Sequence, residues 1–234
     1  MRQSAAPTGV PSPAALAFSS LREYLRHANA LLAIVAVRLV PFYVFLWYFP
    51  VPDSNMHALA ETVVVVPCVA ALVRFVCESG ARDGPPVFRE ALLGAPPLAI
   101  LKLLGTSLLV TFVVVLLSLL NAGLFVGFLL AWSLANLVTD QVVVIEGRAL
   151  VGAIWRSLEL IARLWPASLV VFFVVLLPDL ANIILYAAMS ETAWRELVTR
   201  GITVLTLPYT TLLLTRYYEQ LAPLTPGPRR RREK

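Results

Sequence analysis

The chain has 234 residues, of which 59% are hydrophobic and only 14% are charged, and its mean hydropathy is +0.80. Soluble domains are typically about 45–50% apolar and about 25% charged, so this composition excludes an ordinary soluble domain and indicates a membrane protein. The formal net charge is +5. Because the arginines flank apolar runs, we expect membrane lipids with anionic headgroups as partners, and no nucleic acid.

The first residues, 1–18, contain Pro and Ser but no continuous apolar core, so they predict a disordered segment and not a signal peptide. Residues 17–28, AFSSLREYLRHA, predict a short amphipathic helix with Ser19 or Ser20 as its cap. The remaining organisation that we expect is a helical membrane domain over 19–220 and a basic tail over 221–234.

A membrane-spanning helix needs about 20 mostly apolar residues. Segments of that length predict six spans, at 29–49, 57–78, 97–119, 122–145, 166–188 and 197–218. Their Val and Thr content favours strands in water, but their length and the lack of clean alternation favour helices in lipid. The predicted fold class is therefore all-α, a polytopic membrane protein with a very tight turn at 121–123.

The distribution of Lys and Arg predicts the orientation. With a cytoplasmic N-terminus and six spans, the outer segments contain only Arg195 and Arg200, and nearly all other cations lie on the inner side. The positive-inside rule therefore places both termini in the cytoplasm.

A charged stretch separates the fourth and fifth predicted spans. On a helical wheel, Arg148, Arg156, Glu159 and Arg163 lie within roughly 80° of one another at about 100° per residue, opposite an apolar face. This pattern predicts a helix lying flat in the cytoplasmic interface, with its arginines toward headgroups or water and a Glu159–Arg163 pair. Residues 84–96 predict a similar, shorter helix.

Residues 142–165, VVVIEGRALVGAIWRSLELIARLW, resemble the signature of a group of bacterial six-span membrane domains: a Val-rich run, Glu-Gly, then a basic amphipathic helix with an Arg-Ser pair and a terminal Trp or Phe. The group includes the membrane domain that precedes some glycerophosphodiester phosphodiesterases, and stand-alone proteins of unknown function. PVFREALLGAPPLAILKLLG and PYTTLLLTRYYEQL are similar to other parts of the group, so the resemblance covers most of 20–220.

One departure is the Asn121-Ala122-Gly123 sequence, where the group often has Pro-Gly. A basic tail stands where a phosphodiesterase domain would follow. The resemblance therefore implies a membrane module in a bacterial inner membrane and not the hydrolase.

Charged residues inside a membrane indicate functional sites by default. Arg38 lies within the first span, and Asp140 lies near the inner end of the fourth with Asn136 one turn away. We expect Arg38 and Asp140 to pair. The pair would be either a polar track for an ion, proton or lipid headgroup, or a clamp that fixes helix register.

A second polar set lies toward the outer halves of three spans: Glu61, Asp179, Asn182 and Arg200. These residues form either a polar cluster or separate interfacial contacts with water. Pro67, Pro178 and Pro208 fall inside spans and predict kinks, which can shape a cavity.

At the C-terminus, four consecutive arginines predict either a positive-inside anchor or a docking tail for an acidic partner or anionic lipid: Arg229, Arg230, Arg231 and Arg232.

The two cysteines, Cys68 and Cys77, lie half a helical turn out of phase, so we expect them to face opposite ways as apolar core thiols. We expect no metal, no cofactor and no enzymatic activity, because no phosphate loop, metal cluster or nucleophile elbow is present.

The function that these features favour is a scaffold or accessory subunit of a membrane complex, with a possible protein partner at the cytoplasmic face. The alternative is a small transporter or a lipid-handling protein.

Overall fold

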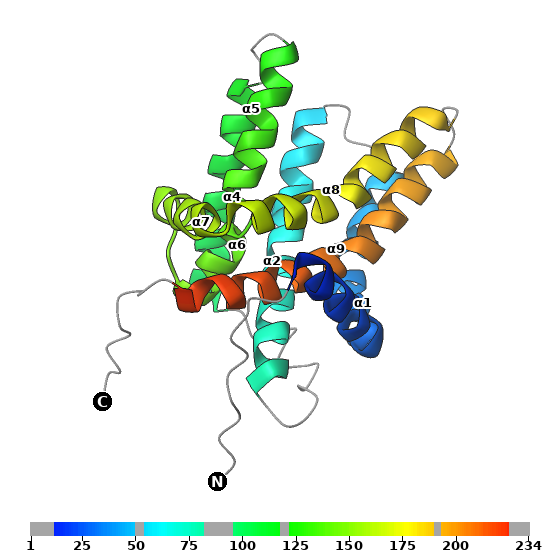
Figure 1. Ribbon diagram of the computed structural model, residues 1–234. Coiled ribbons are helices and arrows are strands. Elements are labelled where there is room, and N and C mark those ends of the chain that lie inside the picture. The colour runs from blue at the N-terminus through cyan, green and yellow to red at the C-terminus, as the bar shows by residue number, and fades with distance from the viewer. Residues whose placement is uncertain (1–11, 50–53, 82–95, 118–121, 190–192, 225–234) are drawn as a thin grey trace.

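The computed structural model describes residues 12–49, 54–81, 96–117, 122–189 and 193–224, and this part of the chain contains helices and no strand. The helices are α1 (Pro13–Tyr48), α2 (Ser54–Ala81), α4 (Pro97–Leu117), α5 (Ala122–Ala135), α6 (Thr139–Gln141), the π-helical turn η1 (Val142–Glu146), α7 (Val151–Arg163), α8 (Trp165–Ala188), α9 (Ala193–Leu221) and the 3₁₀ turn η2 (Ala222–Leu224) (Figure 1).

Six stretches of these helices are long and apolar enough to cross a membrane: Pro13–Tyr48, Ala60–Ser79, Pro97–Leu117, Leu124–Glu146, Trp165–Ala188 and Trp194–Leu221. Large apolar side chains such as Phe112, Phe173 and Ile184 are exposed on them. Such a surface suits hydrocarbon and would cause aggregation in water. The predicted all-α, six-span fold is confirmed, and the protein is a multi-pass membrane protein.

The start of α1 differs from the prediction. Ser12 caps the helix by accepting a hydrogen bond from Ala15 N at 3.2 Å, and Pro13 occupies its first turn. The helix then continues without interruption to Tyr48, so residues 13–18 are not disordered and 17–28 is not a separate interfacial helix. The extension is stabilised by packing, since Leu16 and Ser20 are buried.

The helix α9 runs antiparallel to α1 along most of its length. Glu23 forms an ion pair with Arg216, Tyr24 donates a hydrogen bond to Leu205 O at 3.0 Å, and Arg200 contacts Tyr43. The beginning of α1 and the end of α9 therefore lie on the same side of the bundle, as an even number of spans requires. α9 changes direction along its length, and Pro208 lies inside it (Figure 1).

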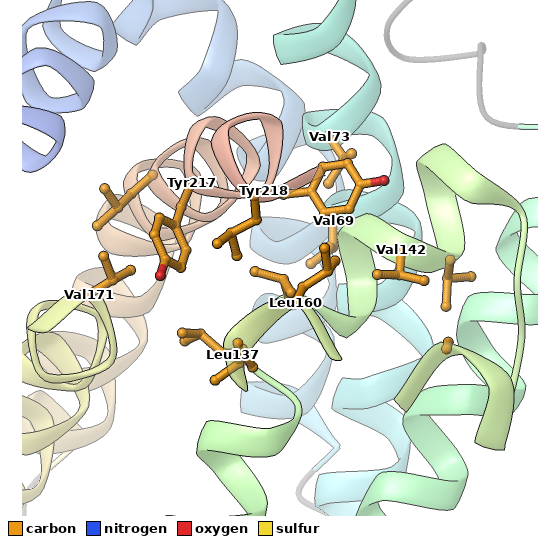
Figure 2. Packing of buried hydrophobic residues seen from close by; sticks show 14 of the residues in the cluster. Val69, Val73, Leu137, Val142, Leu160, Val171, Tyr217 and Tyr218 are labelled. Carbon is orange, nitrogen blue, oxygen red and sulfur yellow. The ribbon is translucent and has the colours of Figure 1, made fainter. Parts of the chain in front are cut away.

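The core lies around α2, which has two packed faces. Cys68 and Leu72 belong to a cluster shared with α1, while Val69 and Val73 belong to a second cluster shared with α4, η1, α7, α8 and α9. Figure 2 shows this second cluster, where α2, η1, α7, α8 and α9 converge. Cys77 packs against the second cluster, so the prediction that the two cysteines face different ways is confirmed.

The fourth predicted span is interrupted, which the sequence pattern did not reveal. α5 ends at Ala135, and the chain turns before resuming as α6 and η1. Asn136 stabilises the turn: its Nδ2 donates to Trp132 O at 2.8 Å, and its Oδ1 accepts from Thr139 Oγ1 at 3.2 Å. Broken membrane helices are tolerated only where protein or a water-filled cavity surrounds the freed backbone groups.

The orientation predicted for the charged face of α7 is wrong for Arg156. Its side chain is only 5% exposed and points into the protein, where its Nε lies 3.1 Å from Glu146 Oε1 and its Nη1 lies 3.3 Å from Glu159 Oε2. Trp155 and Leu158 are exposed instead. The partly buried carboxylate of Glu146 attracts the guanidinium more strongly than the interface does. A helical wheel of α7 could not show this partner, because Glu146 lies outside α7.

Three predictions lie outside the described residues. These are the helix over 84–96, the basic tail with Arg229–Arg232, and part of the tight turn between α4 and α5.

We predict that Arg156→Ala destabilises the fold by about 1.5–3 kcal/mol, because it removes the charge-assisted contacts of a buried guanidinium with Glu146 and Glu159, although Arg148 and Tyr218 still contact Glu146. The matched control is Arg74→Ala, which removes an i,i+4 pair with Glu78 in which Arg74 is 34% exposed; such pairs contribute about 0.3–0.5 kcal/mol. Unfolding of both variants in detergent, followed by tryptophan fluorescence, measures the difference. Equal losses in the two variants would contradict the role of the buried pair.

Candidate functional site

A polar cavity of about 530 Å³ lies between the second half of α1, the first half of α2, the second half of α8 and the first half of α9. Three members of the predicted outer cluster line it: Glu61, Asn182 and Arg200. Asp179 does not, although it lies one turn before Asn182 on α8. The structure therefore brings three of these four residues to one cavity.

Tyr43 forms hydrogen bonds with two charged residues of the cavity, Glu61 and Arg200. Its hydroxyl donates a 2.7 Å hydrogen bond to Glu61 Oε1, and its backbone carbonyl accepts a 3.5 Å bond from Arg200 Nη1. Arg200 Nη2 also lies 2.9 Å from Glu196 Oε2. Because the Glu196 side chain is 52% exposed, this last pair is weak and easily exchanged.

Two further features shape the cavity wall. Asn182 Oδ1 is buried and has no hydrogen-bond partner among the described residues. The ring of Tyr186, which lines the cavity, carries the Arg195 guanidinium 3.9 Å from its centroid, and its hydroxyl accepts from Arg195 Nη2 at 2.9 Å. The cavity thus offers one cation, two carboxylates and an unsatisfied acceptor to a ligand.

A second hollow, of about 490 Å³, adjoins the first along α1 and α9. Apart from Arg200 its lining is apolar or aromatic, including Val40, Val44 and Trp47. It shares Tyr43 and Arg200 with the polar cavity. A polar cavity and an apolar groove therefore meet at one arginine, an arrangement that fits an amphipathic ligand.

The sequence did not identify Tyr43, Tyr186, Glu196, Thr199 or Thr203 as members of this site. A signal existed for Tyr43, because a tyrosine inside an apolar span needs a partner for its hydroxyl. The partner, Glu61, is on another helix, so spacing along the chain could not reveal the pair.

The structure does not bring Arg38 and Asp140 together. Arg38 Nη1 donates to Ile34 O at 3.3 Å on α1, whereas Asp140 lines a separate cavity with residues of α2 and α4. Ile34 and Leu39, the neighbours of Arg38 on α1, pack in the cluster that contains Cys68 and Leu72 of α2. The α2 residues beside Asp140, Val66 and Val69, belong to the other cluster. Asn136 lines the same cavity as Asp140.

Near α7, the side chains of Arg148, Arg156 and Tyr218 all contact the Glu146 carboxylate. Arg148 Nε lies 3.0 Å from Glu146 Oε2, and the Tyr218 hydroxyl donates to Glu146 Oε1 at 2.9 Å. Glu159 pairs with Arg156, three residues earlier. Within the described residues, no group of three or more His, Cys, Asp or Glu side chains could hold a metal ion.

Comparison of the chain with protein-family models, with curated proteins and with solved structures finds no match.

We predict that water reaches the polar cavity. In a chain with Cys68 and Cys77 replaced by alanine, Thr203→Cys should react with a membrane-impermeant maleimide, because Thr203 lines the cavity. Thr211→Cys is the matched control, since Thr211 lies two turns later on α9 and is 4% exposed. Mass spectrometry measures the labelling. Failure of Thr203→Cys to react above the level of Thr211→Cys would contradict the accessibility of the cavity.

Proposed function

We propose that the protein is a lipid-handling membrane protein that binds an aminophospholipid, a lipid whose headgroup carries both a phosphate and a primary ammonium. The observation that carries this proposal is that the polar cavity and the apolar groove share Tyr43 and Arg200. Apolar pockets with a few convergent polar groups are typical of small-molecule sites. The six-span fold and the exposed apolar surface support lipid as the surrounding solvent.

The charges of the cavity fit the two ends of such a headgroup. Arg200 supplies a guanidinium for the phosphate, which it can bind with two parallel hydrogen bonds. Glu61, Glu196 and the unsatisfied Asn182 Oδ1 supply acceptors for the ammonium. The exchangeable pair between Arg200 and Glu196 lets both side chains turn to opposite charges of the headgroup.

The apolar groove fits an acyl chain. Val40, Val44, Trp47 and Leu205 line it and are each 46% to 54% exposed on the outer surface of α1 and α9. A groove open to the bilayer allows a lipid to enter sideways without leaving hydrocarbon. This access favours binding of a membrane lipid over binding of a soluble metabolite.

The membrane setting that we propose is the bacterial inner membrane, with both termini in the cytoplasm. The clustering of Arg148, Arg156 and Arg216 on the side where α1 begins and α9 ends supports this orientation. The resemblance to bacterial six-span domains remains a hypothesis. Anionic lipids remain predicted partners of that basic side.

The scaffold or accessory-subunit function remains a prediction as well. It depends on the helix over 84–96 and on the basic tail, which lie outside the described residues, and on arginines of α7, of which Arg156 is turned inward. The cavity geometry therefore favours lipid handling.

We predict that delipidated protein binds phosphatidylethanolamine more tightly than phosphatidylglycerol in a native mass spectrometry titration. Arg200→Gln should weaken phosphatidylethanolamine binding by about 10-fold to 100-fold, because a hydrogen bond to a charged group contributes about 1.5–3 kcal/mol. Arg74→Gln, a cation on α2 away from the cavity, is the control and should bind normally. Tighter binding of phosphatidylglycerol, or an equal loss in both variants, would refute the proposal.

The orientation has its own test. A green fluorescent protein fused after Lys234 should fluoresce, and an alkaline phosphatase fused there should be inactive, since both report a cytoplasmic C-terminus. The reverse pattern would reject the orientation without affecting the lipid site.

A further inference from the structure

A third cavity, of about 270 Å³, lies inside the bundle where the fourth span is broken, between α2, α4 and α6. Valine and leucine form part of its wall, but several oxygen-bearing side chains line it too: Thr62, Ser107, Thr111, Asn136, Thr139 and Asp140. Polar groups are costly in hydrocarbon unless they are hydrogen-bonded or bind a ligand, and Asn136 and Thr139 meet this need through bonds within the protein. Asp140 does not, which makes it the residue to explain.

We propose that this cavity binds a monovalent cation, with Na⁺ as the ion to test, and that Asp140 supplies its counter-charge. Asp140 is the one charged residue among those that line the cavity. Among the described residues, no hydrogen bond or ion pair involves its carboxylate. An ionised carboxylate held this way inside a membrane domain is costly unless a cation compensates it.

The neutral lining matches the ligands of a hard cation. Hydroxyl, amide and carboxylate oxygens are the groups that such ions prefer over nitrogen or sulfur. The Asn136 Oδ1 accepts one bond from Thr139 Oγ1 and keeps a second lone pair. Ser107 and Thr111 present hydroxyls from neighbouring turns of α4.

The break in the span provides a second reason to expect a cation. Where a helix ends, its last carbonyls lack partners in the helix. In membrane proteins, unwound backbone and the C-terminal ends of half-helices coordinate Na⁺ in this way. Here α5 ends at Ala135, directly before Asn136, so the end of a half-helix adjoins the cavity. Of its last four carbonyls, those of Trp132 and Leu134 already accept backbone bonds, so Ser133 and Ala135 carry the carbonyls that a cation would use.

Charge favours a monovalent ion over a divalent one. A single carboxylate neutralises one positive charge, and a divalent cation would leave a net charge inside the bundle. The described residues also contain no cluster of three or more His, Cys, Asp or Glu side chains of the kind that holds divalent metals. The volume accommodates a cation together with water, since a water occupies about 30 Å³ in the liquid.

The experiment is thermal unfolding of the purified full chain in detergent, at fixed pH and ionic strength, with NaCl replacing choline chloride. A ligand that binds the folded state raises the Tm in a saturable way. We expect such a rise for the wild type and its loss in Asp140→Asn. Asp179→Asn is the matched control, because Asp179 lies on α8 and does not line the cavity; it should keep the rise.

A second variant covers the case in which Asp140→Asn does not fold. Thr111→Val keeps the charge and the volume but removes one hydroxyl, and it should shift the Na⁺ titration to higher concentration. The proposal is overturned if NaCl and choline chloride give the same wild-type Tm, if both carboxylate variants respond equally, or if the Tm depends on pH but not on Na⁺. Because Arg200 is absent from this cavity, the lipid proposal can fail while this one stands.

Discussion

The carboxylate of Glu146 is the contact on which the rest of the structure depends. It receives Arg156 and Arg148, and the Tyr218 hydroxyl donates to it. These residues come from the end of the fourth span, from the loop and helix that follow, and from α9. Because the Arg156 side chain is almost fully buried, loss of Glu146 leaves this guanidinium with an ion pair to Glu159, whose side chain is 44% exposed.

This contact also fixes the interruption of the fourth span. With α7 held against the bundle, Ser157 Oγ accepts from Val138 N at 3.4 Å, directly at the break. The chain then turns through Gly147, whose φ is +72°, and Lys102 Nζ donates to the Gly147 carbonyl at 2.7 Å. The Glu-Gly and Arg-Ser pairs of the sequence signature are thus the residues that hold the break and α7 together.

The sequence predicts the spans because membrane crossing depends on length and apolarity, which are local. It also places Glu61, Asp179, Asn182 and Arg200 at similar depth, as either a cluster or separate contacts with water, and the structure brings all of them except Asp179 to one cavity. The same reasoning fails for Arg38 and Asp140, because Arg38 bonds to Ile34 O on α1 while Asp140 lines a cavity with residues of α2 and α4. It also fails for the break after Ala135, since the apolar pattern continues through Leu137 and Val138 and the stabilising partner, Ser157, is on another helix.

The two proposed binding cavities share one wall. Glu61 lines the lipid cavity and Thr62 lines the cation cavity, and these are consecutive residues of α2. Consecutive side chains on a helix point about 100° apart, so one turn of α2 contributes a lining residue to each cavity. Pro67 follows Thr62 by five residues and has no N–H to bond to the Val63 carbonyl. The α2 helix therefore lacks one backbone hydrogen bond directly after the residues that line the two cavities. Any displacement of α2 at this turn would therefore move lining residues of both cavities together.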